Sequence, residues 1–342
     1  MRFDLWSSYS RMLKSRLLEE AIARLWQDGL ISGEMHLGTG EEAIIAGIVP
    51  QLVEGDAMAL DHRGTSALLL RGVDPVLILH ELLGRPDGLC GGMGGHMHLF
   101  SKEYLAASSG IVGAVGPTAT GFAMSAQVLH TQAITVAFFG EGALNQGMMM
   151  EALNLAAVWK LPILFVCKDD SWSITTSSSS VSGGDPLSRA RSLGIQAVDV
   201  DGRQVSDVWQ AAQTSIQRLR AGEGPLFLHV RCVHLEGHFL GYQLIRMVRH
   251  PLRELPRVVI PLTTSFLHPG GAAFNERLAG VKIILGAVLD TLRDPRRDIS
   301  NDPLYCTRLV LQPDARRLQE LEDQAKQEIG QVVEVALAGA AR

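Results

Sequence analysis

Two acidic positions with the chemistry of metal ligands stand where two apolar runs of the chain end. Residues 134–139 (ITVAFF) lead into the triplet Gly-Glu-Gly at 140–142, and residues 163–167 (ILFVC) are followed closely by Asp170. Because both runs are continuously apolar, we expect them to be buried strands of a parallel sheet. The carboxyl ends of such strands meet at one edge, where ligands bind. The pattern therefore predicts one βαβ unit with a ligand site at this edge.

The residue types at this edge suit a metal ion better than a bare anion. Gly140 and Gly142 allow the backbone to approach a bulky anion, and a helix expected from about residue 145 to 160 offers free N–H groups. Glu141 and Asp170 would repel that anion unless a divalent cation lay between them. We therefore expect a metal-bridged diphosphate. The alternative is a plain turn with structural glycines and solvated acids, since a Gly-x-Gly pattern alone is weak.

The whole stretch resembles a known family. Its segments GEGALNQG (140–147), EALNLAAVWKLP (151–162) and FVCKDDSW (165–172) resemble the thiamine-diphosphate motif of the alpha subunit of 2-oxo acid dehydrogenases. Glu141 replaces the family's metal-binding aspartate and Asp170 its second asparagine, and both remain oxygen donors. The resemblance implies Mg²⁺ held by Glu141, Asp170 and the backbone carbonyl of Trp172. It also implies that Gly140, Gly142 and Ala143 contact the cofactor, in addition to Glu141, Asp170 and Trp172.

Two histidines stand where the same family has active-site histidines. His36 lies in ISGEMHLGTGEEAIIAG (31–47), which resembles the entry to the family's second helix, where a histidine lies near the substrate's carbonyl and carboxylate. His238 lies in HLEGHFLG (234–241), which resembles an active-site loop that reaches the diphosphate and the reacting carbon. The resemblance implies catalytic roles for both, in positioning or proton transfer. A hydrogen-bonded structural histidine is the alternative for His36.

Three further segments match the family's cofactor contacts. His62 and Arg63 follow the apolar residues 57–60, at the position of a pair whose arginine meets the diphosphate. Gly110 and Val112 open a GIVGA turn whose backbone contacts the aminopyrimidine. The glycine-rich segment 88–99 (GLCGGMGGHMHL) resembles a loop that crowds the cofactor. Alternatively, Arg63 is a surface arginine without a ligand. The alternative for the glycine-rich loop is a flexible lid.

Strands alternating with helices predict an α/β fold, a doubly wound parallel sheet flanked by helices, as in thiamine-diphosphate-binding proteins. Helices are expected at 5–26, 76–83, 117–129 and 205–219, with Glu19 and Glu20 solvated on the first, and strands at 197–200 and 226–233. We expect a main domain at 1–245, a divergent insertion at 246–301 packed on the core or a partner, with a short helix at 281–292, and a C-terminal helical segment at 302–342.

Composition narrows the classes of function. The 342 residues carry a net charge of −5 and are 46% hydrophobic, which argues against electrostatic binding to nucleic acid or an anionic membrane. The N-terminus does not read as a secretory signal, no apolar run is long enough to span a membrane, and the cysteines are scattered singly. We expect a cytoplasmic protein with reduced thiols at the following positions: Cys90, Cys167, Cys232 and Cys306.

The resemblance implies a specific activity and specific partners. The chain would be the alpha subunit of a dehydrogenase that uses thiamine diphosphate and Mg²⁺ to decarboxylate a 2-oxo acid such as pyruvate, or to cleave acetoin. The acyl unit would pass to a lipoyl acyltransferase. Only one of the two α/β domains needed by this cofactor fits in the chain, which implies a beta subunit and an α2β2 assembly. Alternatives are a non-oxidative two-carbon transferase, similar to transketolase, and a catalytically silent cofactor-binding subunit. The sequence does not select the substrate.

Overall fold

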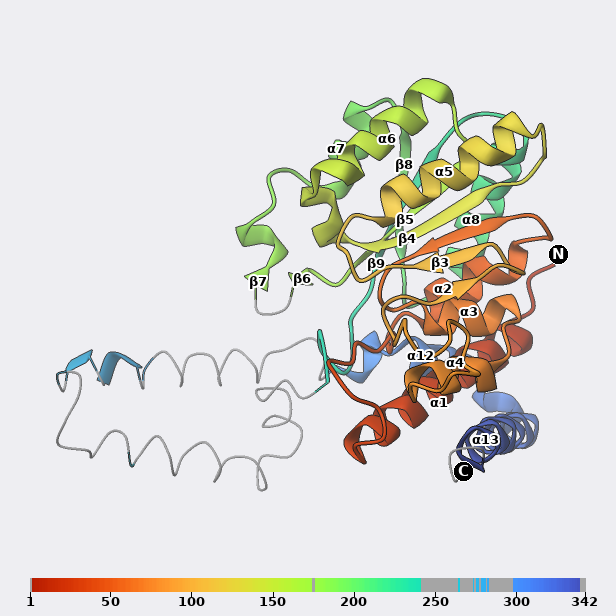
Figure 1. Ribbon diagram of the computed structural model, residues 1–342, viewed down its shortest axis with the longest axis vertical. Helices are drawn as coiled ribbons and strands as arrows, with labels where there is room; N and C mark the ends of the chain where they lie inside the picture. The colour runs from red at the N-terminus through yellow and green to blue at the C-terminus, as the bar shows by residue number, and fades with distance from the viewer. Residues whose placement is uncertain are drawn as a thin grey trace.

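The computed structural model describes residues 2–173, 176–240 and 298–338, with a few single residues between 264 and 282. Its centre is a seven-stranded sheet in the order β2-β3-β1-β4-β5-β9-β8, parallel except for the β2–β3 pair (Figure 1). The strands are β1 (Ala57–Leu60), β2 (Phe100–Ser101), β3 (Ala106–Ser108), β4 (Thr135–Gly140), β5 (Ile163–Asp169), β8 (Gln196–Asp201) and β9 (Leu226–Arg231). The prediction of a doubly wound, mostly parallel sheet is confirmed.

Each central strand contributes side chains to two hydrophobic cores, one on each face of the sheet. On β4, Val136 and Phe138 enter one core, whereas Ala137 and Phe139 enter the other. Both cores need apolar residues, so the strand reads as a continuous apolar run. One core is covered by α5 (Val115–Val128), α6 (Gly147–Trp159) and α7 (Pro186–Ser192), and the other by α1 (Leu5–Gln27), α2 (Glu42–Ile48), α3 (Thr65–Arg71), α4 (Pro75–Leu82) and α8 (Val205–Arg220) (Figure 1).

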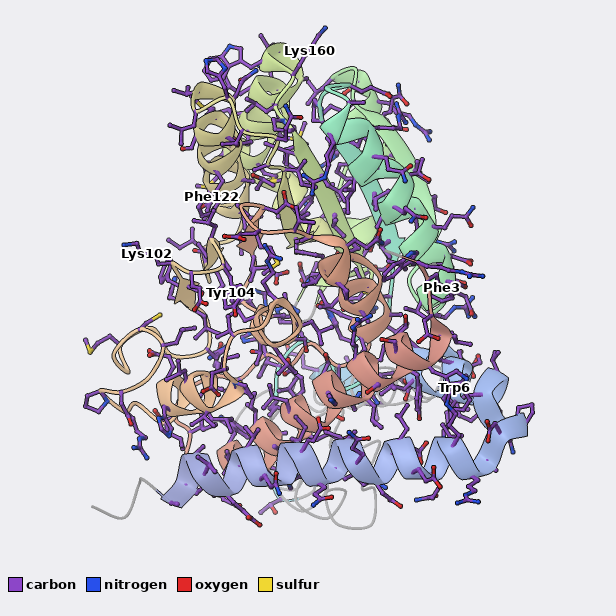
Figure 2. All side chains as sticks on the ribbon, turned by 90° about the vertical axis from the view of Figure 1, so that its right-hand side faces the viewer. Phe3, Trp6, Lys102, Tyr104, Phe122 and Lys160 are labelled. Carbon is purple, nitrogen blue, oxygen red and sulfur yellow. The ribbon has the colours of Figure 1, made fainter. Side chains whose placement is uncertain are left out.

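The helices near the two ends of the described chain pack together. Helix α13 (Ala315–Ala338) contacts α1 and α4, and α12 (Pro303–Leu311) contacts α1. The Tyr9 hydroxyl donates to Glu322 at 2.8 Å. The Arg317 guanidinium of α13 lies 4.2 Å from the centre of the ring of Trp6, which is labelled beside this helix in Figure 2. The C-terminal helical segment expected at 302–342 thus lies against the N-terminal helix, although the boundaries of the three predicted segments stay predictions.

One expectation for the first helix is wrong. Glu19 was expected in solvent with Glu20, but only Glu20 is exposed, and Glu19 is 1% exposed. Its carboxylate accepts a hydrogen bond from Ser66 at 3.2 Å. Burial raises the pKa of Glu19 to about 7. Helix α1 lies between α2, α3 and α13, so more of its surface is covered than an amphipathic pattern indicates.

The expected βαβ unit is confirmed, with a small shift at the turn. A 3₁₀ turn, η2 (Glu141–Asn145), separates β4 from α6, so the helix begins at Gly147. After β5, the short strand β6 (Trp172–Ser173) pairs with β7 (Thr176–Ser177), and the chain continues into a 3₁₀ turn at Ser178–Ser180. The insertion at 246–301, including the helix expected at 281–292, lies almost entirely outside the described residues.

Across the described part of the chain, no helix is long and apolar enough to cross a membrane. The cytoplasmic location stays a prediction.

Candidate functional site

The chain reverses its direction of winding between β1 and β4, and the residues singled out in the sequence gather there. From β1 the chain proceeds to β3 on one side, then crosses to β4 on the other. A crevice forms at such a switch point, outside the carboxyl ends of the strands. His62 and Arg63 follow β1, Glu141 follows β4, Asp170 follows β5 and His238 lies in the segment after β9. The fold therefore brings four sequentially distant segments to one edge of the sheet.

The two expected metal ligands are both largely buried, but each already has a partner. Glu141 is 6% exposed, and the Ser178 hydroxyl donates to its carboxylate. The other carboxylate, of Asp170, lies 2.7 Å from Nδ1 of His234. Burial and the charge of Asp170 raise the pKa of Glu141 to about 7. Burial alone would raise the pKa of Asp170 too, but His234 lowers it to about 2. A cation between the two acids would relieve this repulsion.

A buried ionic network that the sequence analysis missed lies beneath this pair. Nζ of Lys168 is 2.6 Å from Glu41 and 3.0 Å from Asp61, and Nε2 of His234 is 2.7 Å from the second oxygen of Glu41. Burial would raise the pKa of Glu41, but Lys168 and His234 lower it. Asp170 and Glu41 raise the pKa of His234 against the effects of burial and Arg63. The network ties the ends of β1, β5 and β9 to the start of α2.

In the sequence, the feature that indicates this network is the lysine at position 168. Lys168 occupies the sixth position of the strand β5, in register with Gly140 and Val230, and is 2% exposed. A charged residue at a strand position buried on both sides requires a compensating charge. Its partners come from residues more than 100 positions away in sequence, and no local pattern identifies them.

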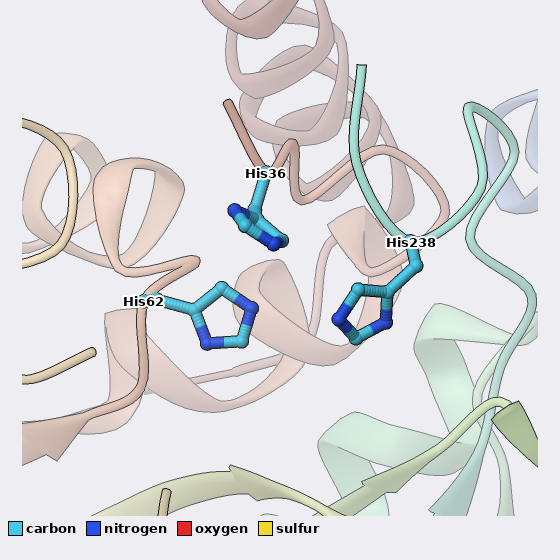
Figure 3. Close-up of side chains that lie close together, drawn as sticks. All are labelled: His36, His62 and His238. Atoms are coloured by element: carbon cyan, nitrogen blue, oxygen red, sulfur yellow. The ribbon is translucent and has the colours of Figure 1, made fainter. Parts of the chain in front are cut away.

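Three histidines of the site lie together (Figure 3). The ring centres of His36 and His62 are 4.6 Å apart, and those of His36 and His238 are 5.3 Å apart. Nδ1 of His36 also lies 3.3 Å from Nε2 of His96, from the glycine-rich loop. Burial, and then the charge of Arg63, lowers the pKa of His36 to about 3, of His62 to about 2 and of His238 to about 4. All three rings are therefore neutral near pH 7.

Arg63 holds this cluster together. Its side chain is buried, and its two terminal nitrogens donate to the backbone carbonyls of Leu37 and, at 2.6 Å, of His238. The guanidinium thus joins the segments that carry His36 and His238. The predicted contact between Arg63 and a diphosphate stays a prediction, because these nitrogens already bind carbonyl groups.

The glycine-rich loop is organised by an acidic residue that the sequence analysis also missed. Glu81 is fully buried at the end of α4 and accepts backbone hydrogen bonds from the loop at 2.6–3.3 Å. The donors are Cys90, Gly92, Gly94 and Gly95. A Cβ at Gly92 or Gly94 would lie 2.6 and 2.1 Å from backbone atoms, so these positions exclude larger residues. The loop wraps a carboxylate, which favours an ordered wall over a flexible lid.

The remaining predicted contacts differ in their exposure to solvent. Gly110 and Val112 follow β3 in a turn, and the Val112 side chain is 53% exposed. Trp172 is 42% exposed, and its backbone N–H donates to Asp170 at 3.3 Å. A Cβ at Gly142 would lie 2.7 Å from the Ser173 hydroxyl, whereas one at Gly140 would lie 3.9 Å from the carbonyl oxygen of Lys168, an ordinary contact distance. Ala143 lies within η2 and is buried in the core. The cofactor and metal roles of these residues stay predictions.

Comparison with known proteins identifies the class to which this fold and site belong. Residues 9–241 match the family model described as "Dehydrogenase E1 component". The chain is 37% identical over 239 residues to the alpha subunit of acetoin:2,6-dichlorophenolindophenol oxidoreductase from Bacillus subtilis, covering 69% of this chain and 72% of that protein. It is also 37% identical over 243 residues to the pyruvate dehydrogenase E1 component subunit alpha from Zymomonas mobilis, covering 70% and 69%.

Among solved structures, transketolase from Campylobacter jejuni superposes with a TM-score of 0.51 at 16% identity, over 68% of this chain and 38% of that one. This likeness concerns the fold alone. The family match and the sequence matches, and not this likeness, define an alpha subunit of the thiamine-diphosphate-dependent class. The chain belongs to the dehydrogenase E1 component family, and the resemblance to its alpha subunits drawn from the motifs is confirmed.

Proposed function

We propose that this chain is the alpha subunit of a thiamine-diphosphate- and Mg²⁺-dependent dehydrogenase that decarboxylates a 2-oxo acid such as pyruvate, or cleaves acetoin. The observation that carries the proposal is the position of the family's motif. Glu141 and Asp170 follow adjacent parallel strands, β4 and β5, at the switch point of a chain whose residues 9–241 match this family. The acyl unit produced would pass to a lipoyl acyltransferase.

The residues present fit a divalent cation that carries a diphosphate. The carboxylates of Glu141 and Asp170 and the backbone carbonyl of Trp172 are oxygen donors, which Mg²⁺ prefers. Burial, and then the charge of Asp170, raises the pKa of Glu141 to about 7, and a cation bound between the two carboxylates would oppose both effects. When bound, thiamine diphosphate supplies the carbon nucleophile and holds the electrons released as the substrate loses carbon dioxide.

The chain's own residues would bind and orient the reactants. The neutral imidazoles of His36 and His238 can donate a hydrogen bond to a substrate carbonyl or carboxylate, or accept a proton from a reacting group. Arg63 holds both histidine segments in place through their backbone carbonyls. Lys168 and His234 keep the carboxylates of Glu41 and Asp170 ionised in a buried setting. The site therefore enters the reaction with its charges already compensated.

A beta subunit would complete the site. The sheet of this chain supplies one α/β domain, and the cofactor of this class binds between two, so we propose an α2β2 heterotetramer. The aminopyrimidine would meet the backbone of Gly110 and Val112, in the turn that follows β3. The substrate pocket would then be shared between the two subunits.

The two alternative functions are less well supported. The likeness to a transketolase is at 16% identity and concerns the fold, so it gives no support to a two-carbon transferase. A silent subunit is disfavoured because its relatives at 37% identity bear the names of enzyme subunits. Both alternatives remain outcomes of the following test.

The test is calorimetric titration of thiamine diphosphate with Mg²⁺ into the chain co-expressed with its beta subunit, followed by assays of carbon dioxide release and acetoin cleavage. We expect Mg²⁺-dependent binding and turnover. Glu141→Ala should abolish Mg²⁺-dependent binding, whereas the exposed control Glu103→Ala should not change it. Unchanged affinity in Glu141→Ala would overturn the metal assignment. Binding without turnover of any 2-oxo acid or acetoin would favour the silent subunit, and two-carbon transfer to an aldehyde would favour the transferase.

A further inference from the structure

The histidine cluster has a geometry that its proposed catalytic roles do not require. His36 precedes α2, His62 follows β1 and His238 follows β9, yet one ring nitrogen from each lies within 4.8 Å of the other two. Figure 3 shows the three rings converging on a common space. We propose that His36, His62 and His238 form a nitrogen-donor site for a transition-metal ion such as Zn²⁺, distinct from the carboxylate pair assigned to Mg²⁺.

The separations need little change to hold such an ion. Zn–N bonds of about 2.1 Å in a tetrahedral site place ligand atoms about 3.4 Å apart, so no pair has to close by more than about 1.4 Å. Rotation of the rings about their side-chain torsions provides movement on this scale. Three protein ligands leave one tetrahedral position open for water.

Unpaired nitrogens are already present in the cluster. Nε2 of His62 and Nδ1 of His238 are buried and have no hydrogen-bond partner among the described residues. Neither ring is therefore held by a hydrogen bond at that nitrogen, and each can turn toward an ion. His36 has a different arrangement, since its Nδ1 lies 3.3 Å from His96, which leaves Nε2 for the ion. Metal-bound histidines commonly have a hydrogen-bond partner at their other ring nitrogen, and His96 occupies that position here.

The charges around the cluster are mixed. Arg63 is the nearest cation and would oppose a bound metal ion, but its terminal nitrogens donate to two backbone carbonyls. Two carboxylates would instead favour a bound metal ion. Asp61 favours positive charge at His62, and Asp170 favours it at His238. All three rings are neutral near pH 7, which is the form that coordinates a metal.

Ligand chemistry separates this site from the magnesium site. Imidazole nitrogen suits Zn²⁺, Cu²⁺ and Ni²⁺, whereas Mg²⁺ prefers oxygen. Zn²⁺ and Cu²⁺ should therefore select the histidines, and Mg²⁺ should select Glu141 and Asp170. A cation in the histidine cluster would also occupy space next to Arg63, where the proposed function places the diphosphate and the substrate.

The test uses the full chain without a polyhistidine tag, titrated calorimetrically with ZnCl₂ in excess Mg²⁺. We expect one Zn²⁺ per chain, and a loss of affinity of about 100-fold or more in His62→Ala and in His238→Ala, because loss of a ligand should exceed the effect of losing a supporting residue. His130→Asn, at an exposed histidine, and Glu141→Ala should bind Zn²⁺ as the wild type does. Circular dichroism would verify that each variant folds, and His62→Gln serves if His62→Ala does not.

Electron paramagnetic resonance of the Cu²⁺-loaded chain identifies the donor atoms. We expect superhyperfine splitting from imidazole nitrogens that changes in both histidine variants. Oxygen-only coordination, or Zn²⁺ affinity that falls in Glu141→Ala and not in the histidine variants, would overturn the proposal.

A second measurement concerns competition, and this part rests on the proposed function. In the chain co-expressed with its beta subunit, Zn²⁺ should weaken thiamine diphosphate binding in the wild type, at fixed Mg²⁺, and not in His62→Gln. Zn²⁺ binding by the histidines without any thiamine diphosphate binding would refute the proposed function and leave the metal site standing. Thiamine diphosphate binding that Zn²⁺ does not affect would refute the competition.

Discussion

Replacing Lys168 with methionine should strongly destabilise the protein. The Lys168 ammonium lies 2.6 Å from Glu41 and 3.0 Å from Asp61, and the side chain is 2% exposed. At an effective dielectric constant of about 20, each separation corresponds to an attraction of about 6 kcal/mol before desolvation is counted. Methionine fills a similar volume but leaves two buried carboxylates without their cation. Removing one partner of such a buried group costs about 3–5 kcal/mol, which is the expected loss of unfolding free energy in Lys168→Met.

The assay is urea unfolding followed by circular dichroism at pH 8, with the exposed Lys102→Met as control. Without Lys168, the pKa of Glu41 should rise, because only His234 and Arg63 then oppose the effect of burial. The wild type keeps Glu41 ionised to a lower pH than the variant does, so the defect of the variant should be smaller at pH 5 than at pH 8. Adding Glu41→Gln should restore part of the stability, because a neutral amide needs no counter-charge.

If Lys168→Met lost less than about 1 kcal/mol of unfolding free energy at pH 8, as expected for a surface lysine, Lys168 would not be the cation that stabilises the two buried carboxylates. A defect of full size that Glu41→Gln does not reduce would also contradict this role, since the cost would then come from packing and not from charge.

Three other perturbations test separate parts of the structure. Burial raises the pKa of Glu19 from 4.5 to about 7, so the folded state loses stability as the pH rises from 4.5 through 7. In urea unfolding, Glu19→Gln should therefore leave stability unchanged at pH 4 and raise it by about 3 kcal/mol at pH 8.5. Equal effects of this substitution at both pH values would contradict this prediction. Gly40 has a φ of +101°, and Gly40→Ala would place a Cβ 1.9 Å from the carbonyl oxygen of Val233. Thermal unfolding should therefore show a loss of about 3 kcal/mol or more in unfolding free energy. Gly183→Ala, where the added Cβ has open space, should show almost no loss. Chelation of Mg²⁺ in the presence of thiamine diphosphate should lower the melting temperature reversibly, and a similar drop in Glu141→Ala would count against the metal site.

Local patterns predicted most of the fold. The runs at 134–139 and 163–167 match β4 and β5 closely, because burial on both faces leaves a continuous apolar signature. The helix expected at 76–83 corresponds to α4, where Pro75 is the first residue and the Asp74 carboxylate accepts a hydrogen bond from the N–H of Val76 at 2.8 Å. These features depend on residues a few positions apart, which a sequence displays directly.

The candidate site was predicted only in outline. The sequence indicated which strand ends carry Glu141, Asp170 and His62, and a parallel sheet brings such ends together. It did not indicate that His234 pairs with Asp170, or that Glu81 organises the glycine-rich loop. From the sequence alone, the side chains of Asp170 and Glu81 could equally well be exposed to solvent.

By itself the sequence determined the doubly wound sheet, the family and the set of chemically capable residues, because these follow from local periodicity and from motifs of adjacent residues. Only the tertiary structure decided how the charges are compensated. Glu41 and Lys168 are 127 positions apart, and Glu41 and His234 are 193 positions apart, yet they form one buried network. Burial and electrostatic compensation depend on what packs against each side chain, and the sheet, by joining distant strands, sets that packing.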